Sequence, residues 1–549
     1  MSMSVAVESS HSRAVQQFSP VVVAALLSLF FVCFYNAFFF RSAIDLVGLA
    51  SIKNALFVVN LGFLLWLVTF IFIYFFTIPY VVSVVFPMVF LVASCVAYFM
   101  DAYGVVIHKL MIQNVMETDV SEVKDLINIK LALYVVVLGV LPSVVLLRIK
   151  IRYSSVGREC WNKLKYISIS LIACVVLILS MSMDYASFFR NHKNIRQSAN
   201  PLSFIYATGS YVASSLETDI VIKPIENDAV VSRFGRSQAK PTLLVLVVGE
   251  TARADHFGIN GYLRDTTPLL AQQNIINFTR VTSCGTETAV SVPCMFSNLG
   301  RRGYSDSKAK SQEGLLDVVY HAGVDVLWRD NNSSCKGTCN RVTSEDMQRL
   351  RVSEVCNSDE CYDEILLHDL DSKVFPVVGS KLLVLHQKGS HGPDYYKRYP
   401  KDHAFFSPVC QTNQLQDCTR EEVINAFDNT IRYTDYFLNK TIEWIKQKNS
   451  QYNTALIYLS DHGESLGENH LYLHGMPYGI APEAQKHVPL IIWMSDDYVN
   501  ANRIDTNCLH DISQKPYSHD NLFHTVLGLL HIETSVLNNN LDILNTCRS

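Results

Sequence analysis

Long apolar runs occupy the first part of the chain, and shorter, regularly spaced ones follow. Five runs lie before residue 184, each near the roughly 20 residues that a membrane-spanning helix needs. They cover residues 19–40, 54–76, 78–100, 131–147 and 166–183. A removable signal peptide is the alternative for the first run, but four more runs follow and no small-residue cleavage site is evident. The pattern predicts a transmembrane domain of five helices at residues 1–183.

The charges between these runs predict how the chain crosses the membrane. Arginines and lysines between the fourth and fifth runs mark a cytoplasmic loop, because cations are enriched on that side. They are Arg148, Lys150, Arg152, Arg158, Lys163 and Lys165. The loop after the third run is acidic instead, and its acids are Asp101, Glu117, Asp119, Glu122 and Asp125. With five spans, the large C-terminal part then lies outside the cytoplasm.

Beyond residue 183 the pattern changes to that of an α/β protein. A polar linker is expected at 184–235, where aromatic residues mix with cations between Tyr185 and Arg196. This mixture suits a segment at the membrane interface, although a solvated linker fits equally. Short apolar runs then alternate with helix-length segments, at 242–249, 324–328, 381–386, 455–460 and 488–493, and Glu421 to Gln447 forms the clearest helix. The alternation predicts a domain at 236–549 with a mostly parallel sheet and crossover helices.

Charge and cysteine content narrow the class of protein further. The formal net charge of −4 gives no sign of a nucleic-acid partner. Ten of the 14 cysteines follow the membrane part, and an even number in an exported domain predicts disulfides. A cysteine-rich zinc site is the alternative, but the Cys-x-x-Cys spacing is absent from these couples. The couples are Cys284 with Cys294, Cys335 with Cys339, Cys356 with Cys361 and Cys410 with Cys418, which leaves Cys508 with Cys547.

Two acidic motifs about two hundred residues apart each follow a strand-like apolar run. Glu250 follows the run at 242–249, and Asp461-His462-Gly follows the run at 455–460. Ligands in open α/β sheets sit outside the carboxyl ends of the strands, so these side chains are expected to meet. Carboxylates with an imidazole and no thiolate suit zinc or manganese. Glu250 alone could be a helix cap, but the two motifs together favour a metal site and hydrolytic or transfer chemistry.

Hydroxyl groups are concentrated between the two cysteines at 284 and 294. A bridge between those cysteines would fix the loop and could present a hydroxyl at a helix start, where backbone N–H groups favour anionic oxygens. A metal ion would lower the pKa of that hydroxyl enough for attack at phosphorus. An ordinary Ser/Thr-rich helix cap is the alternative. Residue chemistry leaves Ser283, Thr286, Thr288 and Ser291 as candidates.

These motifs together resemble the lipid A phosphoethanolamine transferases, a family that includes the mobile colistin-resistance enzymes. The resemblance rests on residues 249–256, 283–297, 460–468 and Trp328 to Asn332, and it extends over nearly the whole chain. It implies an alkaline-phosphatase/sulfatase-like fold with a zinc-bound threonine nucleophile. Thr288 takes that role by its position in the motif. The zinc ligands are then Glu250, Thr288, Asp461 and His462.

The resemblance also implies residues that contact the substrate. His391 and His474 are assigned to phosphate binding or to a second metal, with structural histidines near glycine turns as the alternative. Lys336 is assigned to the substrate phosphate with support from Asn332, since a cation there neutralises charge as the phosphoryl group moves.

Further positions concern the ethanolamine group and the acceptor. In the loop after the third run, Tyr103, Asn114 and Glu122 match positions near the ethanolamine group. For Glu122, an ordinary surface charge is a strong alternative. Glu287 and Val290 flank the nucleophile where some relatives carry small polar and aromatic residues, a departure that bears on acceptor fit.

The activity implied is transfer of phosphoethanolamine from phosphatidylethanolamine to a lipid A phosphate through a covalent intermediate on Thr288. The protein is then an inner-membrane, multi-pass enzyme with its catalytic domain in the periplasm, bound to membrane lipids and monomeric. Transfer lowers the anionic charge of lipid A and so weakens binding of cationic peptides such as polymyxin.

Other activities of the same fold are the alternatives. They are transfer to core sugars of lipopolysaccharide, phosphoglycerol transfer and sulfate ester hydrolysis. A sulfatase would need a Cys or Ser in a Cys-x-Pro-x-Arg-like setting, which is missing around Thr288. From a different class, the chain could be an inactive lipid-binding sensor, but the intact nucleophile and ligand positions argue against it.

Overall fold

The computed structural model of the chain describes residues 17–548 except 50, 118–119, 192, 216–221, 358–359 and 376–377. Its contacts divide the described residues into two units. The first lies within Met1–Asp101 and Asn128–Tyr206, and the second within Ala102–Ile127 and Ala207–Ser549. The acidic loop between the third and fourth apolar runs therefore packs with the large C-terminal unit, far from it in sequence.

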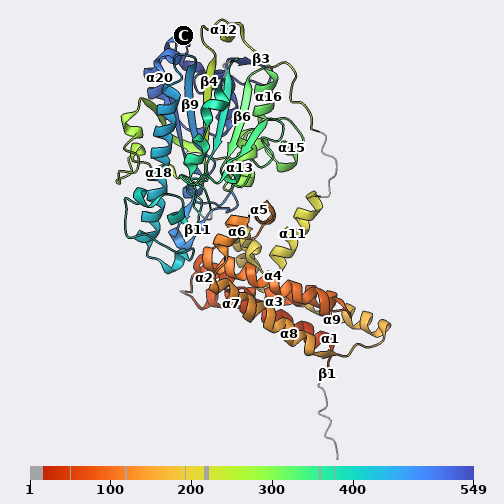
Figure 1. Cartoon of the computed structure of the whole chain (residues 1–549). Helices are drawn as coiled ribbons and strands as arrows, with labels where there is room; N and C mark the ends of the chain where they lie inside the picture. Colours follow the sequence, from red (N-terminus) through yellow and green to blue (C-terminus); the bar gives the residue numbers. More distant parts are fainter. Residues whose placement is uncertain are drawn as a thin grey trace, which may run out of the picture. The chain divides into compact units, whose positions relative to one another are not determined.

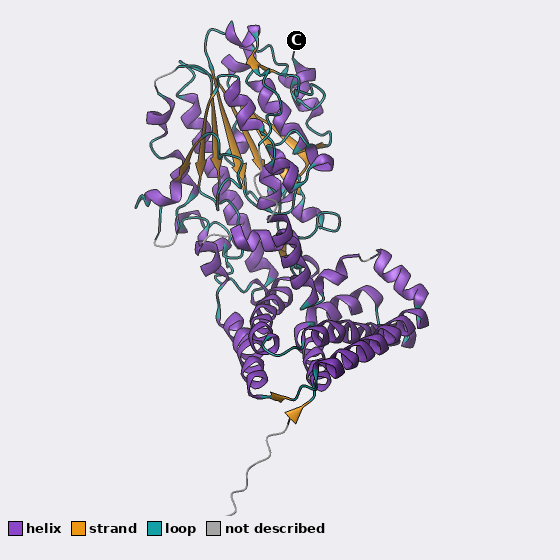
Figure 2. Ribbon diagram, turned by 90° about the vertical axis from the view of Figure 1, so that its right-hand side faces the viewer, coloured by secondary structure: helices purple, strands orange, loops and turns teal. Residues whose placement is uncertain are grey.

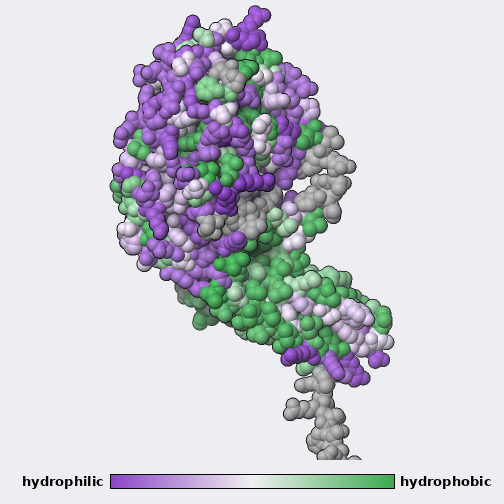
Figure 3. Space-filling model, viewed as in Figure 1, coloured by the Kyte–Doolittle hydropathy of each residue, from purple (hydrophilic) through white to green (hydrophobic). Residues whose placement is uncertain are grey.

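Apolar helices make up the first unit. Among the described residues, four helices are long and apolar enough to cross a membrane. They are α3 (Ile52–Phe76), α4 (Val81–Tyr103), the continuous stretch Ile129–Arg148 that contains α7 (Ile129–Tyr134) and α8 (Leu141–Arg148), and α9 (Val156–Ser180). A fifth is the pair α1 (Pro20–Tyr35) and α2 (Ala37–Val47), bent by 63°. The chain thus has four to five candidate spans, and their hydrophobic surface is visible in Figure 3.

The break between α1 and α2 has an identifiable cause at Asn36. Its side-chain amide donates hydrogen bonds to the carbonyls of Phe31 (3.0 Å) and Asn200 (2.7 Å), and its Oδ1 accepts one from the Asn200 amide at 2.9 Å. A buried asparagine that bonds to a distant backbone segment competes with the helix's own ladder. The apolar run at 19–40 therefore does not form one straight helix. The hydropathy pattern could not predict the bend, because it does not detect such a hydrogen bond.

The start of the predicted linker packs within the first unit. Helix α10 (Ser182–Asn191) carries Tyr185 and Phe188, whose rings lie 5.1 and 5.3 Å from the ring of Phe57. A short 3-10 helix (Lys193–Ser198) and α11 (Leu202–Ser215) follow. The aromatic residues of this segment thus fill an apolar core of the first unit.

An eight-stranded sheet forms the centre of the second unit, with strand order β13-β5-β12-β9-β4-β8-β6-β7. The strands are β4 (Thr242–Gly249), β5 (Ile275–Thr282), β6 (Asp325–Asp330), β7 (Thr343–Asp346), β8 (Lys381–His386), β9 (Asn453–Ser460), β12 (His487–Met494) and β13 (Tyr517–Ser518). Every neighbouring pair is parallel except the two that β12 makes with β9 and β5. The sheet is therefore mixed, with a single reversed strand.

All five apolar runs predicted as strands lie in this sheet, as β4, β6, β8, β9 and β12. Three strands were not predicted. In β5 buried and partly exposed residues mostly alternate, so its apolar character is diluted by asparagine, threonine and arginine. The strands β7 and β13 are short and polar. Strands near the edge of a sheet bury less surface, so they carry a weaker hydrophobic signal.

Helices cover both faces of the sheet, as Figure 2 shows. In β4 the side chains of Leu244, Leu246 and Val248 belong to one core, shared with α13 (Thr288–Met295), α16 (Leu315–His321) and α21 (Asp520–Leu529). The alternate residues face the core on the other side, shared with the long helix α18 (Arg420–Lys446). Figure 1 labels α13, α16 and α18 around β4 and β9. The predicted helix at Glu421–Gln447 is confirmed as α18.

Five disulfides are present in the second unit. They join Cys284 to Cys294, Cys335 to Cys339, Cys356 to Cys361, Cys410 to Cys418 and Cys508 to Cys547. The predicted couples are confirmed, including the last one, which had been assigned only by elimination. Four of the five bridges close short loops, so they constrain loops locally.

Candidate metal centre and nucleophile

Strand register brings the two acidic motifs together. The parallel strands β4 and β9 pair Gly249 with Ser460, and the Asp461 amide donates a hydrogen bond to the Gly249 carbonyl at 2.9 Å. The next residue of each strand, Glu250 and Asp461, therefore leaves the sheet at the same level. Both are fully buried at the carboxyl edge, where α/β proteins bind ligands.

The candidate nucleophile reaches this point from a third element. Thr288 is the first residue of α13, and its Oγ1 lies 3.0 Å from Glu250 Oε2 and 3.3 Å from His462 Nε2. The Cys284–Cys294 bridge ties the preceding loop to this helix. Of the four hydroxyls left open by residue chemistry, Thr288 is the one whose hydroxyl contacts both Glu250 and His462 among the contacts of the described residues.

We refer to Glu250, Asp461 and His462 as the metal cluster. One ligand atom from each lies within 4.8 Å of the others. His462 Nε2 is 3.4 Å from both Glu250 Oε1 and Asp461 Oδ2. His462 Nδ1 lies 2.9 Å from the Gly463 carbonyl, which can only accept, so the Nδ1–H donates there and Nε2 carries a lone pair. Three electron-rich atoms thus face one another.

The metal cluster fits a divalent cation on this evidence. Glu250 Oε1 and Asp461 Oδ2 are buried and have no hydrogen-bond partner among the described residues. Buried polar atoms are nearly always satisfied, and one that is not requires an explanation such as an ion. Two carboxylates and one imidazole form a donor set that zinc accepts. The Nδ1–H of His462 donates to the Gly463 carbonyl, and a second hydrogen bond of this kind is typical of metal-ligating histidines.

The electrostatics of the cluster agree with this. Burial raises the pKa of Glu250 well above its usual range, and the nearby charge of Asp461 adds to the effect. Burial raises the pKa of Asp461 to about 7. Burial and the charge of His474 hold the pKa of His462 well below its usual range. The buried environment of the metal cluster therefore disfavours bare anions, and a bound cation would reverse that preference.

Asn332, which the sequence assigned to support of Lys336 at the substrate phosphate, contacts the metal cluster in the structure. Its side-chain amide donates to Glu250 Oε2 at 2.7 Å and to the Gln387 carbonyl at 2.9 Å. Its backbone amide donates to Asp330 Oδ1 at 2.8 Å, at the end of β6. A third strand end thereby fixes the orientation of the Glu250 carboxylate.

The two further histidines also lie at the cluster. The ring centroid of His474 is 4.4 Å from that of His462 and 5.5 Å from that of His391. Burial lowers the pKa of His474, but the carboxylate of Glu464, 3.2 Å from Nδ1, outweighs it together with other acids, and the pKa is raised to about 9. Burial and the charge of His474 lower the pKa of His391 well below its usual range. The raised pKa of His474 favours its charged form, which suits a phosphate.

Four other residues were predicted to contact the substrate, and the structure describes the side-chain surroundings of three of them. Lys336 Nζ donates to the Ser333 carbonyl (2.9 Å) and hydroxyl (3.0 Å), one residue beyond Asn332. Tyr103 is buried, and its hydroxyl donates to the Asn413 carbonyl at 3.0 Å. Asn114 is partly buried on α5 (Lys109–Glu117). The side chain of Glu122 lies outside the described residues. Substrate contact by these four residues stays a prediction.

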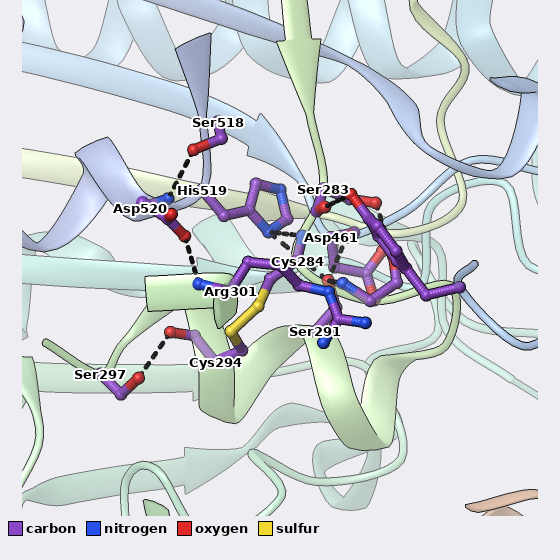
Figure 4. The surroundings of a disulfide bond; sticks show 12 residues. Ser283, Cys284, Ser291, Cys294, Ser297, Arg301, Asp461, Ser518, His519 and Asp520 are labelled. Carbon is purple, nitrogen blue, oxygen red and sulfur yellow. Dashed lines mark hydrogen bonds between the residues drawn. A yellow bond between two sulfur atoms is a disulfide. The ribbon is translucent and has the colours of Figure 1, made fainter. Parts of the chain in front are cut away.

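Two residues hold α13 against the metal cluster (Figure 4): His519, which no sequence motif singled out, and Ser291, which the sequence left only as a candidate nucleophile. His519 Nδ1 accepts a hydrogen bond from the Cys284 amide at 3.1 Å, and its Nε2–H donates to the Ser460 carbonyl at 2.9 Å. Ser291, one turn after Thr288, donates its hydroxyl to the Asp461 carbonyl. His519 lies more than 220 residues from Cys284, so no local pattern indicates this role.

A second buried carboxylate shapes the loop beside Glu250. Asp363 accepts hydrogen bonds from the Asn331 side chain (2.9 Å) and from the backbone amides of Lys388 (2.8 Å) and Gly389 (3.0 Å). Gly389 has φ +53°, and a Cβ there would lie 2.7 Å from the Glu250 carbonyl. Only glycine fits this close approach, which explains the glycine before Ser-His391.

The fold and site define a class of protein. Residues 242–532 match the Sulfatase family, and residues 64–216 match the family described as phosphoethanolamine transferase EptA/EptB. The second unit is thus a sulfatase/alkaline-phosphatase-like domain. It is joined to a membrane part that matches the phosphoethanolamine transferase EptA/EptB family.

Similar proteins of known activity identify the family. The chain is 42% identical over 460 residues to phosphoethanolamine transferase EptA of Escherichia coli K12, covering 83% of this chain and 84% of that protein. It is 39% identical to phosphatidylethanolamine transferase Mcr-2 of Escherichia coli, covering 92% and 95%. The solved integral membrane lipooligosaccharide phosphoethanolamine transferase A from Neisseria meningitidis superposes with a TM-score of 0.94 at 36% identity, covering 97% and 100%. The chain belongs to the phosphoethanolamine transferase family and is a membrane protein.

Proposed function

We propose that this protein transfers phosphoethanolamine from phosphatidylethanolamine to a phosphate of lipid A. The observation that carries the proposal is the Thr288 hydroxyl, which lies at a helix start within 3.3 Å of both Glu250 and His462. A hydroxyl beside an acidic cluster with orphaned buried oxygens suits a nucleophile for phosphoryl transfer. Membership of the phosphoethanolamine transferase family supports phosphoethanolamine as the group that is transferred.

Zinc is the metal that we propose for the cluster, held by Glu250, Asp461 and His462 together with the Thr288 oxygen. When bound, zinc supplies positive charge that lowers the pKa of the threonine hydroxyl and offsets negative charge on the phosphoryl group. Asn332 orients Glu250, and the Gly463 carbonyl keeps His462 in the required tautomer.

The transfer takes two displacements at phosphorus. In the first, a bond forms from Thr288 Oγ1 to phosphorus and the bond from phosphorus to the diacylglycerol oxygen breaks. The threonine hydroxyl loses one proton and the departing diacylglycerol oxygen gains one. In the second, an oxygen of the lipid A phosphate attacks and that phosphate gives up a proton, while the bond to Oγ1 breaks and the threonine takes up a proton. The charged His474 and Lys336 neutralise the phosphoryl oxygens in both steps, and the neutral His391 ring donates a hydrogen bond to them.

The membrane part is proposed to keep this site beside its lipid substrates. We propose five spans in the inner membrane within residues 1–183, a membrane-surface linker at 184–235 and a periplasmic catalytic domain at 236–549, acting as a monomer. The cationic loop at Arg148–Lys165 fits the cytoplasmic side, and the five disulfides fit an oxidising compartment. Holding the catalytic domain near two lipids raises their effective concentration.

The decisive experiment is mass spectrometry of lipid A from cells that express the chain or its Thr288→Ala variant. We expect a phosphoethanolamine adduct with the parent and none with the variant, together with higher polymyxin resistance only for the parent. The expected loss is complete because the alanine has no oxygen to form the intermediate. Zinc content and expression level of the variant are the controls.

The outcomes separate the parts of the proposal. An adduct that persists in the variant removes Thr288 from its role. A zinc-loaded parent that forms no lipid A adduct in cells overturns lipid A as the acceptor. In that case mass spectrometry of the lipopolysaccharide core distinguishes transfer to core sugars.

A further inference from the structure

The turn that carries His391 is held from both ends. On one side, the Ser390 amide donates a hydrogen bond to the Glu250 carbonyl at 3.0 Å. On the other side, the Arg398 Nε–H donates to the His391 carbonyl at 2.7 Å. The Nδ1 atom of the His391 ring is buried and has no hydrogen-bond partner among the described residues. The backbone at His391 is therefore fixed, while its ring keeps a position open for a substrate group.

Arg398 is the centre of a buried ionic network. Only 4% of this residue is exposed. Its Nη1 donates a hydrogen bond to Glu360, and its Nη2 donates to Asp125 Oδ2 at 3.0 Å. All three nitrogens of the guanidinium thus have partners, each from a different segment of the chain. Because the guanidinium is planar and its donors point in fixed directions, the two carboxylates determine where the Nε–H points.

Asp125 anchors the acidic loop at 102–127 to this network. Its Oδ1 accepts a hydrogen bond from Lys397 Nζ at 2.7 Å. The Asn413 side chain donates to the Asp125 carbonyl, and the Asn413 carbonyl accepts the Tyr103 hydroxyl at 3.0 Å. Burial would raise the pKa of the Asp125 carboxyl, but the neighbouring cations outweigh it and lower that pKa, which favours the carboxylate. The two ends of the loop therefore meet at one place, beside the buried arginine.

The packing around the turn links His391 to His474. A Cβ added to Gly392 would lie 2.7 Å from Leu473 Cδ2 and 2.9 Å from the Tyr395 hydroxyl. Leu473 directly precedes His474, and the centroids of the two histidine rings are 5.5 Å apart. A shift of this turn therefore changes the position of His391 relative to His474.

We propose that Arg398 is a positioning residue, which holds His391 against the transferred phosphoryl group, and that Asp125 ties the acidic loop to the same arginine. This assignment rests on the proposed function of the site. Arg398 touches no reacting atom in it and acts through the backbone of His391. Lysine cannot replace it, because an ammonium lacks the rigid fork that serves two acids and a carbonyl at once. A misplacement of about 1 Å at a catalytic group can lower the rate about 100-fold.

A double-mutant cycle with the purified full-length, zinc-loaded protein tests the assignment. The quantity measured is kcat/KM in mixed micelles, with phosphatidylethanolamine as the donor and lipid A as the acceptor. We expect Arg398→Lys to lower kcat/KM at least about 10-fold and His391→Ala to lower it about 100-fold. In the His391→Ala background, Arg398→Lys should lower it less than about 2-fold further, because its effect passes through that histidine. Arg349→Lys, an exposed arginine paired with Asp346, is the matched control and should leave kcat/KM unchanged.

Asp125→Asn is the second variant, in case Arg398→Lys fails to fold. The amide keeps the shape of the side chain but turns N–H donors toward one of its two cations. We expect a loss of about 3-fold in kcat/KM, which is likewise absent in the His391→Ala background. Two results would overturn the assignment. One is an unchanged kcat/KM in Arg398→Lys, and the other is a loss that persists in full when His391 is already alanine.

Hydrogen exchange keeps this assignment separate from the proposed function, because it needs no turnover. Mass spectrometry follows the peptide at 388–394, whose first four amides are hydrogen-bonded in the structure. We expect exchange there to be at least about 10-fold faster in Arg398→Lys than in the wild type, with no change in β4. If the wild type transfers no phosphoethanolamine yet this difference is present, the proposed reaction fails and the positioning by Arg398 stands. Equal exchange at 388–394 in the two proteins overturns the positioning.

Discussion

Two sets of buried carboxylates lie near the carboxyl edge of the same sheet, and they are held in opposite ways. In the metal cluster, Glu250 Oε1 and Asp461 Oδ2 have no hydrogen-bond partner among the described residues, and both face the lone pair of His462. Asp363 is equally deep, but both of its oxygens accept hydrogen bonds from side-chain and backbone donors. Each carboxylate of the metal cluster thus has one oxygen without a donor among the described residues, whereas both oxygens of Asp363 have donors.

The difference shows which buried charges serve the fold and which serve the chemistry. Asp363 fixes Lys388 and Gly389, and Gly389 packs on the backbone of Glu250. Asp363 therefore positions the loop at Lys388 and Gly389, and this loop in turn packs against Glu250 of the metal cluster. A buried polar group whose bonds are all made contributes to stability, whereas one left unmade costs free energy until a ligand completes it.

The largest expected effect is that of Asp461→Asn on activity and on the response to metal removal. We expect transfer to fall by at least about 10³-fold, because an amide is a poor zinc ligand. In the wild type, chelation should lower the free energy of unfolding by about 4 kcal/mol if zinc is present at 1,000 times its Kd. The variant should show no such response, and without zinc it should be at least as stable as the wild type. Transfer assays and thermal unfolding with and without chelator measure this.

Asp265→Asn, an exposed acid, is the control for that substitution. A zinc-free Asp461→Asn protein that is clearly less stable than the zinc-free wild type would contradict the comparison. It would mean that the Asp461 carboxylate, like that of Asp363, serves the fold.

The second effect is a loss of stability in Asp363→Asn. The amide turns N–H donors toward backbone N–H groups and leaves them unsatisfied, so we expect the free energy of unfolding to fall by about 2–3 kcal/mol. Chemical denaturation of the protein measures the change. Asp497→Asn, which removes half of an exposed pair with Lys240, is the matched control and should change stability by less than about 1 kcal/mol. Equal effects of the two substitutions would refute the structural role of Asp363.

The smallest effect concerns the pH dependence of stability at a third buried carboxylate. Both oxygens of Asp435 accept backbone N–H groups, from Leu269 at 3.0 Å and Leu270 at 2.8 Å, yet burial raises its pKa to about 6. Since the folded-state pKa lies above the unfolded value, the folded state holds the proton to higher pH. The contribution to stability is complete below the unfolded pKa of 3.8 and is lost as pH rises through 6.

We expect this group to remove about 2 kcal/mol of stability between pH 4.5 and pH 6.5. Because other groups titrate in the same window, the measurement is the difference between wild type and Asp435→Asn in denaturation at the two pH values. The variant should lose less stability as pH rises. Identical slopes would show that the Asp435 carboxylate titrates normally and that its hydrogen bonds offset its burial.

Several features of this protein could be predicted from the sequence, because they depend on the local pattern of residues. The apolar runs predicted strands β4, β6, β8, β9 and β12, and the strand ends predicted that Glu250 would meet Asp461 and His462. Each apolar run ends directly before its acid, so the parallel pairing of β4 and β9 brings the two carboxyl ends to one edge of the sheet. The weakly apolar strands β5, β7 and β13 were missed, because a strand with little buried surface has little hydrophobic signal.

Other features depend on contacts between distant residues and left no local trace. The bend at Asn36 comes from its bonds to Asn200, and the position of α13 depends on His519 and Ser291. The sequence placed the acidic loop at 102–127 between two spans, with three residues that the resemblance assigned near the ethanolamine group, but no local pattern showed which unit it packs with. In the structure it packs with the C-terminal unit and brings Asp125 to Arg398.

The sequence by itself determined which chemical groups are available: two acidic motifs at strand ends and a threonine in a loop bounded by cysteines. It also indicated a membrane part whose cationic loop predicts its orientation. Residue type and periodicity carry that information because they act over a few positions. Only the tertiary structure decided which buried acids lack donors, which tautomer His462 holds, and which residues hold His391. Hydrogen-bond satisfaction depends on groups brought together from hundreds of residues apart, and no local pattern encodes that sum.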